Sequence, residues 1–131
     1  MAAQESYPDE LKYNAEHDWA RVEDGEATLG ITWFAQDALG ELVHYEAPEA
    51  GATVTRDAPY GEVESVKAVS DVIAPLSGEV IEVNAKVVDA PETVNEDPYG
   101  DGWLVKIRIA DPAEADALMD AAAYKNHLAT L

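Results

Sequence analysis

Apolar and polar residues alternate most clearly near residue 105 of the chain. In Trp103-Leu104-Val105-Lys106-Ile107-Arg108-Ile109, the apolar side chains of the second half fall on one face and the two basic side chains on the other. Because successive side chains of a strand point to opposite faces, this pattern predicts a half-buried strand. Shorter apolar and β-branched runs predict further extended segments over residues 27–32, 42–46, 63–69 and 80–83.

Helix signals occur at two places. Thr32 is a suitable N-cap for a short helix that runs through Leu39 and ends at Gly40. Near the C-terminus, Asp111-Pro112-Ala113-Glu114 combines a capping residue, a proline at the first helical position and a glutamate three residues after the cap. Residues 121–131 then form either a second helix or a continuation of the first. The predicted class is mainly β with short helices and a helical C-terminus.

A short repeat accompanies the predicted strands. Gly61-Glu62-Val63 recurs as Gly78-Glu79-Val80, seventeen residues later. Val66 and Val83 match at the same offset, as do Ala68 and Ala85. The repeat is either chance in a chain rich in Val, Ala and Glu, or a sign of two similar β arms joined by a turn.

Length and composition indicate one globular unit. The chain has 131 residues, 47% of them hydrophobic, which is enough for one domain with a core. We expect residues 1–10 to be a flexible N-terminal lead-in and residues 11–131 to form the single domain. The chain contains no run of about 18 apolar residues that would span a membrane, and residues 1–10 lack the pattern of a secretory signal. These features predict a cytoplasmic protein, which we expect to be monomeric.

The charge of the chain is strongly negative. Twenty-seven acidic residues against eight basic ones give a formal net charge of −19. Nucleic acids and anionic membranes are therefore poor partners. The acidity serves either solubility or adaptation to salt, or it steers the protein toward basic surfaces on partner proteins, and the sequence does not separate these interpretations.

Few side chains of this sequence suggest metal binding or catalysis by the chain itself. The three histidines, His17, His44 and His127, match no metal-binding spacing. No serine lies in a nucleophile motif, and with no cysteine the chain has neither disulfides nor thiolates. If the protein takes part in chemistry that uses sulfur, a prosthetic group must supply the sulfur.

The segment around Lys67 is the most informative. Lys67 stands between two β-rich arms, with Gly61 before it and Gly78 after it. This arrangement predicts a lysine at the tip of a hairpin, where an enzyme that modifies lysine can reach it. A surface lysine on a hairpin is ordinary, however, and the physical pattern alone does not assign it a function.

The same segment resembles the lipoyl-attachment region of glycine cleavage H proteins. The resemblance begins with Glu64-Ser65-Val66-Lys67-Ala68, continues with Ser70-Asp71, and extends over about residues 9–128 in order. Its other parts are Leu11-Lys12-Tyr13, His17-Asp18-Trp19, Gly30-Ile31-Thr32, Ala35-Gln36, Leu39-Gly40, Ala74-Pro75-Leu76-Ser77-Gly78, Val94-Asn95, Pro98-Tyr99, Gly102-Trp103 and Ala123-Tyr124.

The resemblance implies a fold and a function. The fold is a barrel-sandwich hybrid of two antiparallel sheets, a single lipoyl-carrier domain with lipoate attached covalently to Lys67. The protein is then a carrier and not an enzyme. Its lipoyl arm receives the aminomethyl group of glycine from glycine decarboxylase (P protein) and delivers it to the aminomethyltransferase (T protein), after which dihydrolipoamide dehydrogenase (L protein) reoxidises the arm. A lipoate-attaching enzyme is the fourth expected partner.

The resemblance also suggests contacts around the arm. Glu64, Ser65, Asp71 and Asp18 are the expected contacts of the lipoyl arm or of the modifying enzyme. Carboxylates at Asp18 and Asp71 would hold the cationic aminomethyl group by charge-assisted hydrogen bonds and limit access by water.

The chain departs from the family pattern at two places. Trp33-Phe34 stands where the family often has an acidic residue and a histidine, and Asp18 stands where it usually has glutamate. The first departure puts a partner contact near that helix in doubt, and the second shortens a carboxylate by one methylene.

Three other functions remain open at this point. An H-like protein serving as lipoyl donor in a protein lipoylation relay would use the same lysine. A biotin carrier is disfavoured because Lys67 is flanked by Val66 and Ala68 where biotinyl lysines usually have methionines, and a hydrolase would require turnover by the unmodified chain. Among the other lysines, Lys86 lies just past the repeat and lacks the Glu64-Ser65 lead, so we expect it to remain unmodified.

Overall fold

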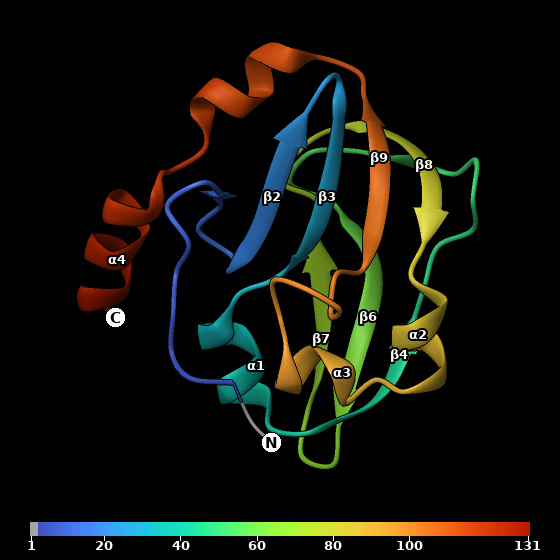
Figure 1. Cartoon of the computed structure of the whole chain (residues 1–131), viewed down its shortest axis with the longest axis vertical. Helices are drawn as coiled ribbons and strands as arrows, with labels where there is room; N and C mark the ends of the chain where they lie inside the picture. The colour runs from blue at the N-terminus through green and yellow to red at the C-terminus, as the bar shows by residue number, and fades with distance from the viewer. Residues whose placement is uncertain (1–2) are drawn as a thin grey trace.

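The computed structural model describes residues 3–131 and contains two antiparallel sheets (Figure 1). The larger sheet has the spatial order β1-β2-β3-β9-β8-β5 and the smaller sheet the order β4-β6-β7. The strands of the larger sheet are β1 (Lys12–Tyr13), β2 (Asp18–Glu23), β3 (Glu26–Ile31), β5 (Thr53–Val54), β8 (Gly78–Val83) and β9 (Val105–Ile109). Those of the smaller sheet are β4 (Leu42–Glu46), β6 (Pro59–Ser65) and β7 (Val69–Ile73). The predicted mainly β class, with two antiparallel sheets, is confirmed.

The helices are short and lie around the sheets. They are α1 (Trp33–Leu39), α2 (Ala85–Asp89), α3 (Thr93–Glu96), the 3-10 helix η1 (Pro112–Ala117) and α4 (Ala121–Ala129). In Figure 1 the β6–β7 hairpin extends from the lower end of the molecule, beyond α1 and α3, whereas the β2–β3 turn lies near the upper end, just below the segment that contains η1. The two turns therefore lie at opposite ends of the domain.

The main core lies between the two sheets. Leu29 and Ile107 of the larger sheet and Val63 and Val72 of the smaller one are at most 1% exposed and belong to one apolar cluster. In β9, the apolar side chains enter this core while Lys106 and Arg108 point away from it. The predicted alternation is confirmed, although the strand begins at Val105 and not at Trp103.

A second apolar cluster attaches the C-terminal helix to the larger sheet. Leu11, Tyr13 and Trp19 pack with Ala121 and Tyr124 of α4. The rings of Tyr13 and Tyr124 stack with their centroids 4.7 Å apart. Aromatic pairs of this kind stabilise packing beyond the area that they bury, so α4 is held by specific contacts as well as by burial.

The first helix has the predicted ends. The hydroxyl oxygen of Thr32 accepts a hydrogen bond from the Ala35 N–H at 3.3 Å, as expected of an N-cap. Gly40 ends the helix with φ of +85°, a conformation that side chains with a Cβ rarely adopt. The sequence therefore sets where the chain turns from α1 into β4.

The C-terminal prediction needs a correction. Asp111 caps a helix as expected, but residues 112–117 form a 3-10 helix and not an α-helix. The Glu114 carboxylate does not return to its own cap, because it accepts hydrogen bonds from the N–H and hydroxyl of Ser77. Met119 then pairs with Tyr13 through two backbone hydrogen bonds of 2.8 Å. This pairing separates η1 from α4, so residues 121–129 form a second helix.

Two predictions about the β arms were also partly wrong. Residues 63–69 are not continuously extended, because the chain turns at residues 66–68 between β6 and β7. The repeated segments around Gly61 and Gly78 are not arms joined by a turn, since Gly61 lies within β6 of the smaller sheet and Gly78 starts β8 of the larger one. Both glycines lie against a backbone carbonyl, of Glu46 and of Arg108, where a Cβ would collide. The two glycines of the repeat therefore meet the same steric need.

Residues 3–10 lie against the body of the domain. The Ala3 N–H donates to the Asn95 carbonyl, and the Ala3 carbonyl accepts from the Trp33 indole at 2.8 Å. The Tyr99 hydroxyl donates to the Ser6 carbonyl at 2.7 Å. The flexibility expected of residues 1–10 stays a prediction. Within residues 3–131, no helix has the length and apolar character that crossing a membrane would require.

Candidate functional site

Lys67 lies at the tip of the β6–β7 hairpin, where the sequence placed it. Ser65 closes the turn, because its N–H donates to the Ala68 carbonyl at 2.8 Å. Its buried hydroxyl accepts hydrogen bonds from the N–H groups of Lys67 and Ala68, at 3.3 and 3.2 Å. Ser65 therefore fixes the backbone that carries Lys67.

The Lys67 side chain is exposed and lies beside the end of α1. No carboxylate among residues 3–131 comes within 4.0 Å of its ammonium group. A Cβ built on Gly40 would lie 3.5 Å from Lys67 Cε and 4.0 Å from Nζ. The glycine that ends α1 thus leaves room for the lysine, and the amine stays accessible to a modifying enzyme.

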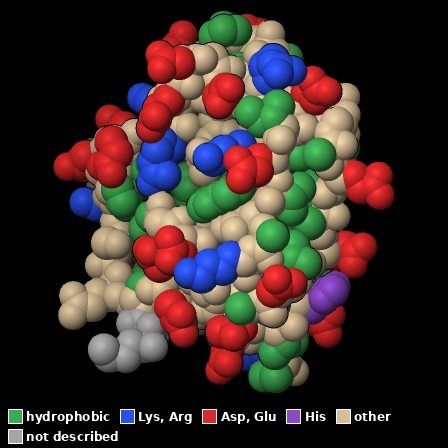
Figure 2. Space-filling view, turned by 45° about the vertical axis from the view of Figure 1, so that its right-hand side comes forward, with side chains coloured by type: hydrophobic (Ala, Val, Ile, Leu, Met, Phe, Trp, Pro, Cys, Tyr) green, Lys and Arg blue, Asp and Glu red, His purple; other side chains and the backbone are tan. Residues whose placement is uncertain are grey.

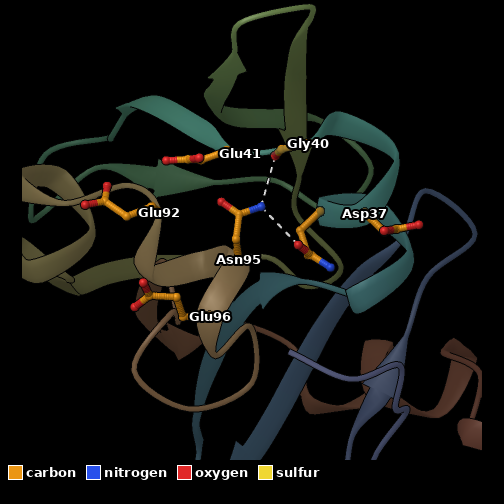
Figure 3. A pocket seen from close by; sticks show the side chains of 7 residues that line it. Asp37, Gly40, Glu41, Glu92, Asn95 and Glu96 are labelled. Atoms are coloured by element: carbon orange, nitrogen blue, oxygen red, sulfur yellow. Dashed lines mark hydrogen bonds between the residues drawn. The ribbon is translucent and has the colours of Figure 1, made fainter. Parts of the chain in front are cut away.

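A pocket of about 310 Å³ opens next to Gly40, between α1 and α3 (Figure 3). Its lining residues are Gln36, Asp37, Gly40, Glu41, Glu92, Asn95 and Glu96. Asn95 links α3 to the C-terminal end of α1, because its amide nitrogen donates hydrogen bonds to Gln36 Oε1 and to the Gly40 carbonyl, both at 2.9 Å. Its amide oxygen accepts from the Leu42 N–H at 2.9 Å. Sequence reasoning noticed Asn95 only as part of a motif and missed that it fixes Gly40 beside Lys67.

Glu64 and Asp71 share the hairpin with Lys67 but point to its outer side. Glu64 pairs with His44 of β4 and with Val69 of β7, and Asp71 pairs with Glu62. Both carboxylates are exposed. The structure therefore brings Glu64, Ser65 and Asp71 together on one hairpin, where only Ser65 is buried.

Asp18 differs from the other expected contacts because it is buried. It is 2% exposed, and its carboxylate accepts hydrogen bonds from Asn14 Nδ2 at 3.1 Å and from the Ile73 N–H at 3.4 Å. Burial raises the pKa of Asp18 well above its ordinary value, against the smaller opposing effect of these two donors. Asp18 connects the start of β2 to the end of β7, at the base of the hairpin that carries Lys67.

The two unusual residues of α1 contact Ala3 and His17 near the N-terminus and Tyr99 between α3 and β9. The Trp33 N–H donates to the Tyr99 hydroxyl at 2.8 Å, and the Trp33 indole bonds Ala3 as described above. The Phe34 ring lies 4.6 Å from the ring of His17. Trp33 and Phe34 therefore pack against these residues at the start of α1.

His17 belongs to a polar cluster that the sequence did not reveal. His17 Nδ1 and the Thr32 hydroxyl each lie 2.8 Å from the Tyr124 hydroxyl. Burial lowers the pKa of His17, with a smaller contribution from nearby His127. This cluster joins α4 to β2 and α1. No group of three or more His, Cys, Asp or Glu residues among residues 3–131 is arranged to hold a metal ion.

Comparison with known proteins gives one consistent family. The family model described as "Glycine cleavage H-protein" matches residues 11–130. The chain is 56% identical to a "Glycine cleavage system H protein" of Marinobacter nauticus, over 93% of this chain and 95% of that one. It is 50% identical to a mitochondrial protein of the same name from rice, Oryza sativa, over 91% of this chain and 73% of that one.

A solved structure agrees with these sequence matches. The crystal structure of a glycine cleavage system H protein from Mycobacterium marinum superposes with a TM-score of 0.87 at 41% identity. The match covers 93% of this chain and 98% of the other. The residues that the family model matches, 11–130, include the hairpin that carries Lys67.

Proposed function

Since this chain belongs to the glycine cleavage H-protein family, we propose that lipoate is attached to Lys67 and that the protein shuttles the aminomethyl group of glycine. The group would be taken from glycine decarboxylase and delivered to the aminomethyltransferase, with dihydrolipoamide dehydrogenase as the third partner. The protein itself is a covalent carrier and not a catalyst. The observation that carries the proposal is the exposed Lys67 amine at the tip of a hairpin.

The residues around Lys67 fit an amide-linked group. Attack of the neutral Lys67 amine on an activated lipoyl carbonyl forms the amide, expels the activating group and releases a proton from the nitrogen. The amine must therefore reach into the attaching enzyme, and the turn fixed by Ser65 presents it away from the domain. When bound, lipoate supplies a disulfide that this chain, with no cysteine, does not have.

The expected contacts of the lipoyl arm differ in exposure, and we assign them different roles. Asp71 and Glu64 are exposed on the hairpin, so they are available to a cationic group on the arm or to the attaching enzyme. Asp18 is buried and accepts two hydrogen bonds, so we propose that it acts mainly by holding the base of the hairpin. The proposed location is the cytoplasm, in keeping with the similarity to bacterial H proteins.

Glycine cleavage reconstituted with the purified partner enzymes tests the proposal. Lys67→Arg keeps a positive charge but removes the amine that can be acylated, so glycine cleavage should fall to background while the fold persists. Lys86→Arg is the matched control. Lys86 lies on α2, and its ammonium group lies 2.8 Å from a carboxylate oxygen of Asp101. This variant should retain full activity. Lipoylation of Lys67 without any glycine cleavage would instead favour the lipoyl-donor alternative.

A further inference from the structure

The side chain of Asn95 joins three segments that are far apart in the sequence (Figure 3). Its nitrogen donates one hydrogen bond to Gln36 of α1 and one to the Gly40 carbonyl, both at 2.9 Å. Its oxygen accepts a third bond, also of 2.9 Å, from the N–H of Leu42, the first residue of β4. Asn95 therefore fixes residues 40–42, the α1–β4 corner, to α3.

The α1–β4 corner flanks Lys67 in two ways. Gly40 lies beside the lysine side chain, since a Cβ built there would be 3.5 Å from Lys67 Cε. Leu42 is 1% exposed and pairs across the sheet with Ser65, whose hydroxyl accepts a hydrogen bond from the Lys67 N–H. Asn95 thus acts on the side chain of Lys67 through Gly40, and on its backbone through Leu42 and Ser65.

The corner depends on a bond from outside because its own strand is irregular at this point. The pairing of β4 with β6 shifts register between Leu42 and His44, and such an irregularity locally disrupts the ladder of backbone bonds. The Leu42 N–H bonds to the Asn95 side chain, on a helix more than fifty residues further along the chain. A single amide side chain therefore sets where β4 begins next to the hairpin of Lys67.

We infer that Asn95 is a positioning residue for aminomethyl transfer, because it fixes the corner from which the Lys67 arm leaves the domain. The inference rests on the proposed function, which supplies the arm. A corner that is ordered in advance spares each partner enzyme the entropy cost of ordering it on binding. When the corner is loosened, only the ordered fraction of chains binds productively, and the apparent Michaelis constant rises in inverse proportion to that fraction.

Asn95→Asp tests this role with almost no change of shape. The carboxylate still accepts a hydrogen bond from the Leu42 N–H, but it has no N–H to give to the Gly40 carbonyl. Because a carbonyl cannot become a donor, two acceptors then face each other at Gly40. The substitution therefore breaks the contact beside Lys67 and leaves the side-chain volume nearly unchanged.

Asn84 offers a matched control. Its nitrogen also donates to two oxygens, the carbonyls of Asp101 and Trp103, at 2.8 and 2.6 Å, and its oxygen also accepts from one N–H, that of Lys86, at 3.1 Å. These partners belong neither to the α1–β4 corner nor to the hairpin of Lys67. Asn84→Asp therefore breaks the same kinds of bond elsewhere in the domain.

The two variants also carry the same change of charge. Each adds one carboxylate to a chain whose net charge is already −19, and Figure 2 shows acidic side chains distributed over the lower half of the molecule. The electrostatic field that a partner enzyme meets is therefore altered little, and by the same single charge in both variants. A difference between the variants must come from the position of the broken bonds.

The first measurement is glycine decarboxylation by the purified decarboxylase with lipoylated full-length chains. For Asn95→Asp we expect the apparent Michaelis constant for the chain to rise about fivefold with little change in kcat, and for Asn84→Asp we expect neither to change. Urea unfolding should show similar losses of stability in the two variants, so that loss of stability alone does not account for the difference. Equal Michaelis constants for the two variants would overturn the inference.

Hydrogen exchange tests the same role without catalysis. In the unsubstituted chain, the Leu42 and Ser65 amides should have similar protection factors, because Asn95 makes the corner and the turn open as one unit. Asn95→Asp should lower both protection factors about tenfold more than Asn84→Asp does. Protection factors in the unsubstituted chain that differ by more than about a hundredfold would mean independent opening and would exclude the role, even if Asn95→Asp does not fold. If the unsubstituted chain carries no lipoate, the proposed function fails, whereas the exchange data still decide whether Asn95 fixes the hairpin.

Discussion

The two sheets of this domain differ in what their outer faces do. The larger sheet pairs opposite charges across β8 and β9, at Glu79–Arg108 and Glu82–Lys106, and has Lys106 over the Trp103 ring, 5.1 Å from its centroid. The smaller sheet lines up Glu46, Glu62 and Asp71 on strands that contain no Lys or Arg, and extends into the hairpin that carries Lys67. The larger sheet therefore serves mainly as a scaffold, and the smaller one presents the exposed Lys67 amine at its hairpin tip.

The largest expected effect of a substitution lies in the scaffold. Ile107→Ala removes a fully buried side chain from β9 and should lower the free energy of unfolding by about 2–5 kcal/mol. Val66→Ala at the exposed tip should change it by no more than about 0.5 kcal/mol. Urea unfolding of both variants measures the difference, and equal losses would mean that the hairpin is as much a part of the scaffold as β9.

A smaller effect is expected at the turn that presents Lys67. Ser65→Ala removes the hydroxyl that accepts from two N–H groups and should cost about 1 kcal/mol of stability. It should also slow lipoate attachment, because the backbone of the tip is no longer fixed. Ser70→Ala on the same hairpin is the control, since the Ser70 hydroxyl bonds only the neighbouring Asp71 carbonyl. A stable variant with unchanged attachment would show that Ser65 does not position Lys67.

The contact between the sheets at Asp18 should depend on pH. Because burial raises the pKa of Asp18 in the folded state, the folded chain holds this proton to higher pH than the unfolded chain does. Its contribution to stability is therefore largest below the ordinary carboxyl pKa of about 4 and is lost as pH rises through the folded value. Relative to Asp18→Asn, the unsubstituted chain should lose stability between pH 4 and neutral pH. A difference that is constant across this range would contradict the shift.

Docking through uncompensated carboxylates should weaken with salt. The apparent Michaelis constant of the unsubstituted chain with glycine decarboxylase should rise severalfold as ionic strength increases. Circular dichroism at each salt concentration verifies that the chain stays folded. A flat series would mean that the net charge of −19 serves solubility alone.

The smallest effect is expected on the lifetime of the loaded arm. If the carboxylates near the hairpin hold the aminomethyl group, replacing Asp18 and Asp71 with Asn should hasten its spontaneous loss by a few fold, roughly 1 kcal/mol or less. The single variants separate the two residues, and we expect exposed Asp71 to matter by direct contact and buried Asp18 through the hairpin base. An unchanged lifetime in the double variant would exclude this role.

The sequence predicted well what depends on neighbouring residues. The Thr32 cap, the Gly40 stop, the alternation in β9 and the exposed Lys67 all follow from local patterns, and the structure contains each of them. Contacts between distant residues were not predictable in this way. Glu114 bonds Ser77 instead of its own helix, and the burial of Asp18 depends on β7.

The candidate site shows the same division. A charged residue such as Asp18 is expected at the surface unless a segment distant in the sequence covers it. The sequence alone does not show which distant segment lies over a given residue. Asn95 was visible as a residue, but its three side-chain hydrogen bonds to α1 and β4 come from segments more than fifty residues away. Lys67 was predicted at a hairpin tip from its own segment, and the structure has it there.

Peptide mapping of the protein isolated from its own source tests the central claim most directly. The chain has five lysines, Lys12, Lys67, Lys86, Lys106 and Lys125, and only Lys67 lies at a hairpin tip with no carboxylate within 4.0 Å of its ammonium group and with a turn fixed by Ser65. We expect lipoate on the peptide that contains Lys67 and on no other. Lipoate on any other lysine, or a Lys67 peptide that remains unmodified while the host cleaves glycine through this protein, would contradict it.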